Sequence, residues 1–266
     1  MIKVPDITIT SLDVIKAFSL AGVPKFILDE LQNARIANTQ EKQDITGKAG
    51  RKLNSLKRNK AVVVSGTNGL LSAGLLEAQT GGAFESKEST PVSWTDYLVI
   101  QSDAANTEFK AVGTAGAEIE ALYVKDAQTG AVIEELTQAE DAAAGKFAYD
   151  PETKALSFEA EKYEDGTEII VFYTRNVAGD VLTNESDKYS EKLRLYIDAT
   201  GEDKCGNIYH VQIHIPKADF SGDFDVEMGE NQSVHAFEAE SLAGSCGAGG
   251  ALWSYTVFGV NADDAA

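Results

Sequence analysis

Cysteine is scarce in this sequence, with two residues among 266. A small scaffold stapled by several disulfides is therefore excluded. The first eleven residues contain no apolar signal segment, and the most apolar stretch, residues 69–76, is too short to cross a membrane. We expect a protein that is made in a cytosol and has no membrane anchor. In that reducing compartment, Cys205 and Cys246 are predicted to be free and partly buried thiols.

Positive charge is also scarce, because 23 Lys and Arg face 42 Asp and Glu, giving a net charge of −19. Such a negative net charge argues against general nucleic-acid binding, which requires a basic face. The charge is divided unevenly, since residues 1–60 carry a net +5 and the remainder carries −24. No acid occurs between Asp44 and Glu77. This window holds a compact basic cluster: Lys48, Arg51, Lys52, Lys57, Arg58 and Lys60.

The basic cluster is open to three interpretations. It is a solvated loop, a local phosphate contact, or a contact with an acidic copy of the same protein. A compact basic element on a strongly acidic body attracts other copies head to tail. Nothing comparably specific points to catalysis, so we place self-assembly ahead of chemistry.

The N-terminal third contains ambiguous periodicity. With 43% hydrophobic residues, the chain has enough apolar material for a real core. Residues 11–22 read as a short capped helix, whereas residues 31–37 fit either a helix or a strand. Residues 38–60 are polar and contain two glycines, which predicts a long exposed loop. A strand at 61–64 and a short helix over 71–81 follow.

From residue 91 onward, short segments of β character are separated by turns. The run 169–173 is apolar on both alternate faces, which predicts a central strand covered on both sides. The clearest alternation places one set of side chains inward: Leu193, Leu195, Ile197, Tyr209, Val211, Ile213 and Ile215. The sequence thus predicts a mainly β protein, a sandwich or barrel with one or two short helices. We expect a single domain over 1–266, with central strands at 92–190 and closing strands at 191–260.

No constellation of residues points to catalysis or to a bound metal. Five soft metal ligands lie in the last third: Cys205, His210, His214, His235 and Cys246. His210 and His214 share one face of a predicted strand, which holds them too far apart to chelate one zinc ion. The segment 244–247 is the nearest imitation of a nucleophile turn and reads as a glycine-rich turn. We expect surface histidines, buried thiols, and no catalytic residue, metal or cofactor.

The acids Asp223, Asp225 and Glu227 recur at every second position. A calcium loop needs its ligands curled around one point, with a glycine at the bend and a distal glutamate. Here the acids alternate with Phe224 and Val226, so they are predicted to form an acidic row on the solvated face of a strand.

Three segments share the sequence style of one known family. Residues 31–82 combine a strand, a long loop, a strand and a short helix. Residues 144–173 place a short displayed turn before Asp165-Gly166-Thr167 and an apolar run that ends at Tyr173. Residues 215–258 form closing hairpins with the ending F-x-A-E-S-L … L-W-x-Y. Together, over nearly the whole chain, these segments resemble the major tail tube proteins of long-tailed bacteriophages.

That resemblance implies a β-sandwich or barrel flanked by one helix, six copies of which join their sheets edge to edge in a ring. Stacked rings would form the hollow tube of a virion tail, assembled from protein made in the host bacterial cytoplasm. Residues 31–37 become a strand, and the loop 38–60 reaches the neighbouring ring, where its basic cluster sets the stacking polarity. DNA would pass as a transient, non-specific passenger along an acidic lumen, with Asp223, Asp225 and Glu227 as candidate wall residues.

The same resemblance implies further tail partners: the tape-measure and terminator proteins and, for a contractile tail, the sheath. A second hypothesis comes from another class, a displayed Ig-like or adhesin-type binding module on a virion or bacterial surface. That module would be a soluble monomer with exposed aromatic side chains at a ligand site. It would leave the basic cluster without a function. A hydrolase on a β scaffold ranks third, because the sequence contains no catalytic motif that supports it.

Overall fold

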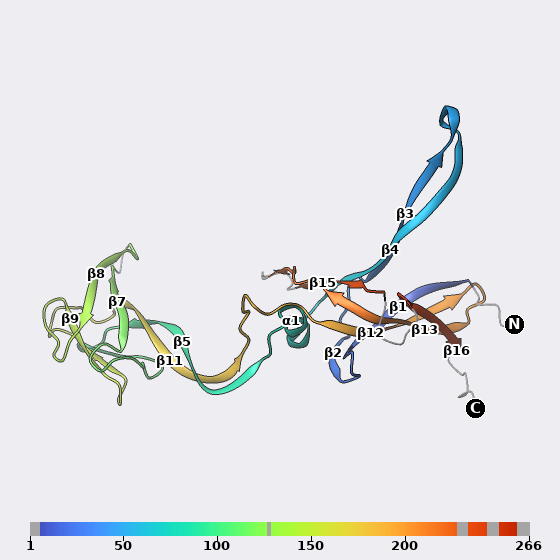
Figure 1. The fold of residues 1–266 in the computed structure, drawn as a ribbon. Helices are drawn as coiled ribbons and strands as arrows, with labels where there is room; N and C mark the ends of the chain where they lie inside the picture. Colours follow the sequence, from blue (N-terminus) through green and yellow to red (C-terminus); the bar gives the residue numbers. More distant parts are fainter. Residues whose placement is uncertain (1–5, 127–128, 228–233, 244–249, 260–266) are drawn as a thin grey trace. The chain divides into compact units, whose positions relative to one another are not determined.

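The computed structural model describes residues 6–126, 129–227, 234–243 and 250–259. Within them the chain is mainly β, with two sheets and one α-helix, which confirms the predicted fold class (Figure 1). The chain divides into two compact units, Met1–Phe84 with Leu182–Ala266 (unit 1) and Glu85–Val181 (unit 2). The sequence predicted a single domain. Each unit instead has its own cluster of buried side chains, and unit 2 is inserted into unit 1.

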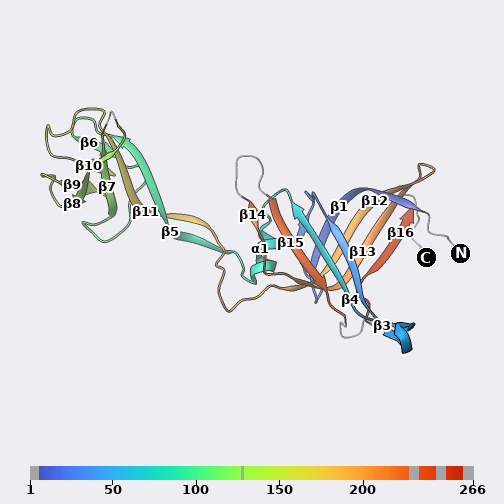
Figure 2. The same cartoon turned by 90° about the horizontal axis from the view of Figure 1, so that it is seen from above.

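Unit 1 is built on a nine-stranded sheet that curves into a half-barrel (Figure 2). The strands along its path run in the order β2-β1-β12-β13-β15-β4-β3, with β14 pairing β15 and β16 pairing β13. Their bounds are β1 Ile7–Ser19, β2 Pro24–Leu28, β3 Arg35–Thr46, β4 Lys52–Asn68, β12 Lys192–Asp203, β13 Ile208–Phe220, β14 Val226–Glu227, β15 Val234–Ser241 and β16 Ser254–Gly259.

The alternation read from the sequence holds in the closing strands. Leu193, Leu195 and Ile197 of β12 are buried in the unit 1 core. On the neighbouring strand β13, Val211 and Ile215 are buried, whereas Ile213 is half-buried. A period of two places one set of side chains on one face of a sheet, so these strands carry the core.

Residues 11–22 do not form the predicted helix. Residues 11–19 belong to β1, whose antiparallel partners are β12 on one side and β2 on the other. Ile15 and Ala17 point into the core, and the half-buried Lys16 and Phe18 alternate with them. The apolar spacing fitted a helix as well, and pairing with two neighbouring strands decided the outcome. The ambiguous segment 31–37 ends in a strand, since β3 begins at Arg35.

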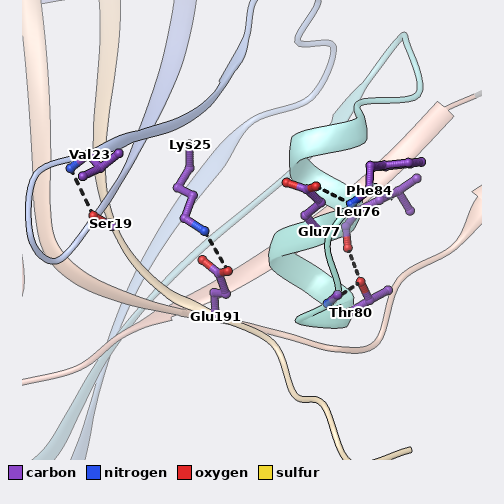
Figure 3. A network of polar contacts seen from close by, with 9 residues as sticks. Ser19, Val23, Lys25, Leu76, Glu77, Thr80, Phe84 and Glu191 are labelled. Carbon is purple, nitrogen blue, oxygen red and sulfur yellow. Dashed lines mark hydrogen bonds and ion pairs between the residues drawn. The ribbon is translucent and has the colours of Figure 1, made fainter. Parts of the chain in front are cut away.

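The predicted short helix is present as α1, Ala73–Thr80. The Ser72 hydroxyl accepts a hydrogen bond from the Leu75 amide, and Gly81 ends the helix in the left-handed conformation (φ 70°). A Cβ at Gly81 would lie 2.1 Å from the Tyr189 carbonyl oxygen, so only glycine fits there. The helix end is fixed further by the Glu77 carboxylate, which accepts the Phe84 amide at 2.7 Å (Figure 3).

Ion pairing supports the same part of unit 1. Lys25 on β2 reaches Glu191, just before β12, with 2.9 Å between Nζ and Oε1 (Figure 3). Both side chains are about one-third exposed, so this pair contributes at most about 1 kcal/mol. The close approach of α1 to β2 depends more on Gly74, because a Cβ there would lie 2.6 Å from the Cβ of Phe26.

His235 is fully buried, which corrects the expectation of surface histidines. Its Nε2 lies 2.7 Å from Oε1 of Gln79 on α1, and its Nδ1 accepts the Ser72 amide at 3.4 Å. The Gln79 side chain in turn donates to the Ala236 carbonyl at 3.0 Å. Burial lowers the pKa of His235 below its ordinary value of 6.5. A neutral imidazole therefore joins α1 to β15.

Unit 2 contains a seven-stranded sheet in the order β5-β11-β7-β8-β9-β10-β6. The bounds are β5 Glu85–Val99, β6 Ala104–Asn106, β7 Ile119–Lys125, β8 Val132–Gln138, β9 Lys146–Asp150, β10 Ala155–Ser157 and β11 Glu168–Val181. β11 lies between β5 and β7, as expected of a central strand. Ile169, Val171 and Tyr173 are buried on one face, whereas Ile170 and Phe172 on the other face are only half-buried.

Asp96 is a buried carboxylate of unit 2. It accepts hydrogen bonds from the Tyr173 hydroxyl (2.8 Å), the Trp94 indole (3.0 Å) and the Glu108 amide (2.8 Å). Burial raises the pKa of Tyr173. Beside this network, the guanidinium of Arg175 stacks on the Trp94 ring, 4.1 Å from its centroid. These contacts fix the end of the unit 2 core.

We predict that Gly81→Ala lowers the free energy of unfolding of unit 1 by roughly 2–4 kcal/mol, because it adds left-handed strain to a backbone clash. Gly22→Ala is the matched control, since Gly22 also has positive φ (91°) but open space around it. It is expected to cost only about 1 kcal/mol. Denaturant unfolding followed by Trp253 fluorescence in a Trp94→Phe background reports on unit 1. Equal losses in both variants would contradict the clash.

We predict that unit 1 loses stability as the pH falls below about 6.5. The lowered pKa of His235 means that the unfolded chain takes up a proton that the folded chain excludes until lower pH. The stabilisation is thus complete above 6.5 and is lost on acidification. His235→Gln is expected to weaken unit 1 at pH 8 and to flatten its pH dependence. His214, whose pKa burial also lowers, leaves a residual slope. An unchanged pH profile in the variant would exclude His235 as the source.

Candidate assembly surface

Residues 38–60 form a β-hairpin, not the predicted irregular loop. β3 and β4 pair from Arg35↔Ser65 to Thr46↔Lys52. The next strand, β15, pairs β4 only over Val63–Asn68, so the distal halves of β3 and β4 pair only with each other. We call residues 39–60 the arm. Figure 1 shows it extending beyond the rest of the half-barrel.

The hairpin was not predicted from the sequence because neither face of the arm is buried. Without a core to face, its strands show no apolar alternation, which is the main signal of a strand. The tip is a short 3₁₀ turn, Lys48–Gly50, in which Ala49 and Gly50 have positive φ (60° and 73°). Register shifts after Thr39 and after Ile45 also break the period.

The arm carries the predicted basic cluster on an extended, solvent-exposed element. All six cluster residues are exposed. The arm as a whole has seven Lys and Arg against Glu41 and Asp44, a net charge of +5. Lys52 pairs with Asp44 at 2.7 Å, and within the described residues it is the one member of the cluster with an ion pair. The remaining five positive charges are available to a partner.

Two features of the arm are unfavourable for an isolated molecule. Lys57 lies directly opposite Lys42, and like charges in that position repel. Near the tip, Ile45, Leu53 and Leu56 are 40%, 58% and 47% exposed. A two-stranded hairpin is marginally stable in water. An acidic, partly apolar partner would relieve both the repulsion and the exposure. Lys42 and the three apolar residues were missed because their importance depends on hairpin pairing.

The acidic row is not a strand face. Asp223 and Asp225 are exposed but precede β14, which comprises only Val226 and Glu227. The two aspartates line an open hollow of about 700 Å³ together with Phe224 and Glu238. Of the three acids, only Glu227 lies in a strand. An alternation of five residues was too short to predict a strand.

The other singled-out residues do not converge on a chemical site. Within the described ranges, no three His, Cys, Asp or Glu side chains are grouped so as to hold a metal ion. Cys205 is a free thiol in an exposed position, not the partly buried one predicted, and Cys246 lies outside the described residues. His214 stacks on Tyr196 with ring centroids 4.5 Å apart. No helix in the described part of the chain is long and apolar enough to cross a membrane.

Comparison with known proteins gives one family. The family model of the YomU/Tube protein family matches residues 11–251, which include the arm, α1 and the whole of unit 2. No curated protein matches the chain.

Proposed function

The chain belongs to the YomU/Tube protein family, and we propose that it self-assembles into stacked hexameric rings that form the hollow tail tube of a bacteriophage. The family name indicates a phage tube structural protein. The observation that supports self-assembly into stacked rings is the arm, a 22-residue exposed hairpin with a net charge of +5 on an otherwise acidic chain. Such an element has a function only against a partner.

Ring formation is supported by an open sheet edge in unit 1. β2 is the terminal strand of the sheet, and its unpaired backbone groups are a template for another strand. Ile27 on this strand and Val23 just before it are 62% and 59% exposed. A neighbouring copy that adds its own edge would cover both, and closure into a ring would remove the free edges.

Stacking is supported by charge. The chain outside residues 1–60 has a net charge of −24, so the basic arm of one copy is attracted to the acidic body of another. The same acidity would keep DNA phosphates from adhering to the tube wall, and the genome would pass as a transient passenger. We propose a structural role without catalysis, in a virion tail whose further partners are the tape-measure and terminator proteins and, in a contractile tail, the sheath.

The proposal is tested by negative-stain electron microscopy of the purified protein over a range of protein and salt concentrations. We expect hollow rings or tubes of uniform width. Monomers under every condition would contradict the proposal and would favour a displayed binding module instead.

Replacement of Lys48, Arg51, Lys52, Lys57, Arg58 and Lys60 by glutamine is expected to weaken stacking, because it removes the charge that attracts the next copy. The monomer is expected to keep its fold, since these side chains are exposed. Sedimentation of assembled protein against ionic strength measures the effect.

The matched control replaces the six lysines of unit 2 with glutamine, which removes the same net charge from another place: Lys87, Lys110, Lys125, Lys146, Lys154 and Lys162. This control is expected to assemble normally. Equal tube yields from both variants would show that the position of the charge is irrelevant.

A further inference from the structure

Unit 1 contains an apolar recess inside the curved sheet. Its volume is about 220 Å³, and its walls come from β1, β3, β4, β12, β13 and β16. The floor is formed by buried side chains such as Val64 and Val211. At the mouth, Ile9 and Tyr255 are 50% and 43% exposed. The recess is therefore an accessible apolar site within an acidic protein.

Helix α1 does not fill this recess. Its Leu75 and Ala78 join the core cluster with Phe26 and Leu28 of β2, and none of these four residues lines the recess. At the recess, Leu12, Ile36 and Ile213 are only half-buried and Tyr255 is 43% exposed, so the described elements cover this part of the core side incompletely. The recess is therefore open to an apolar side chain of another molecule.

The arm of the same molecule cannot cover it. Ile36 lines the recess, whereas Ile45 lies nine residues further along the paired strand β3. At about 3.3 Å per residue, this places the tip about 30 Å away, and continuous pairing with β4 prevents it from folding back. The apolar tip of the arm and the apolar recess are two exposed surfaces that one copy cannot join by itself.

We propose that the tip of the arm, with Leu53, Leu56 and Ile45, inserts into this recess of a second copy. The inference rests on the proposed function and names the docking site of the stacking contact. The end of β1 and β12 beside the recess is acidic: Asp13 on β1, Glu202 and Asp203 on β12 and Asp6 just before β1 stand against two cations, Lys204 just after β12 and Arg35 in the recess lining. These acids complement the Lys and Arg residues that surround the apolar tip.

Such a contact is heterologous, because a protruding patch on one copy enters a hollow elsewhere on the next. Contacts of this type propagate along an axis without using up the site. Burial of three apolar side chains gives the contact its free energy, whereas the charges set its orientation and its rate of formation. The polarity of stacking then follows from the asymmetry of the chain itself.

Disulfide trapping between two differently tagged chains tests the proposal. Both carry Cys205→Ser and Cys246→Ser; one also carries Leu53→Cys and the other Tyr255→Cys. After assembly from the mixture and mild oxidation, docking is expected to yield the mixed dimer at least about tenfold above the control, because it raises the local thiol concentration. The control replaces Leu53→Cys with Leu71→Cys, a leucine that is 55% exposed and does not line the recess.

The outcomes separate the two proposals. Tubes that form without a mixed disulfide above the control level would overturn docking in the recess and leave the tube function standing. Absence of any assembly, in these chains and in the unmodified protein, would overturn both.

The solvatochromic dye Nile red provides a measurement on the unmodified protein. It is expected to bind the recess of the unassembled chain and to be expelled on assembly, with loss of its fluorescence. Dye retained in finished tubes would show that the recess stays open, as a site for a small apolar molecule instead of a second copy, and would overturn the proposal.

Discussion

β4 is one continuous strand of 17 residues that belongs to two environments. Its C-terminal part pairs with both β3 and β15, and Val62 and Val64 are fully buried there. Its N-terminal part leaves the sheet and pairs with β3 alone. Because the strand is uninterrupted, the packing of its core part fixes the direction of the arm. The core thus supplies the rigidity that an isolated hairpin lacks.

The same dependence on the core holds for α1. The helix has only eight residues, too few for a stable helix in water. It is held by the cap at Ser72, by the left-handed Gly81 and by the buried pair of Gln79 and His235. His235 belongs to β15, the strand that also anchors the base of β4. Helix, arm and sheet are therefore joined at one place in unit 1.

Charge and apolar surface are separated by position in this protein. The acids are spread over both units, whereas the free cations of the arm surround three exposed apolar side chains at its tip. In a monomer this arrangement is unfavourable, since it combines like-charge repulsion with hydrated apolar groups. An acidic, partly apolar surface of a second copy would relieve both the repulsion and the exposure, which is why we propose that the arm contacts another copy.

The β class, the alternating strands β12 and β13, the glycine that ends α1 and the location of the basic cluster all follow from the sequence. These features depend on local period, on glycine at positive φ or on composition, all of which a single segment expresses. Strand pairing in the folded chain is what makes residues 11–19 a strand and residues 38–60 a hairpin. Both segments lack a distinctive period, so pairing with distant residues selects their conformation. Tertiary structure also decided the burial of His235 and the separation into two cores, because these depend on which side chains meet across a long distance in the chain.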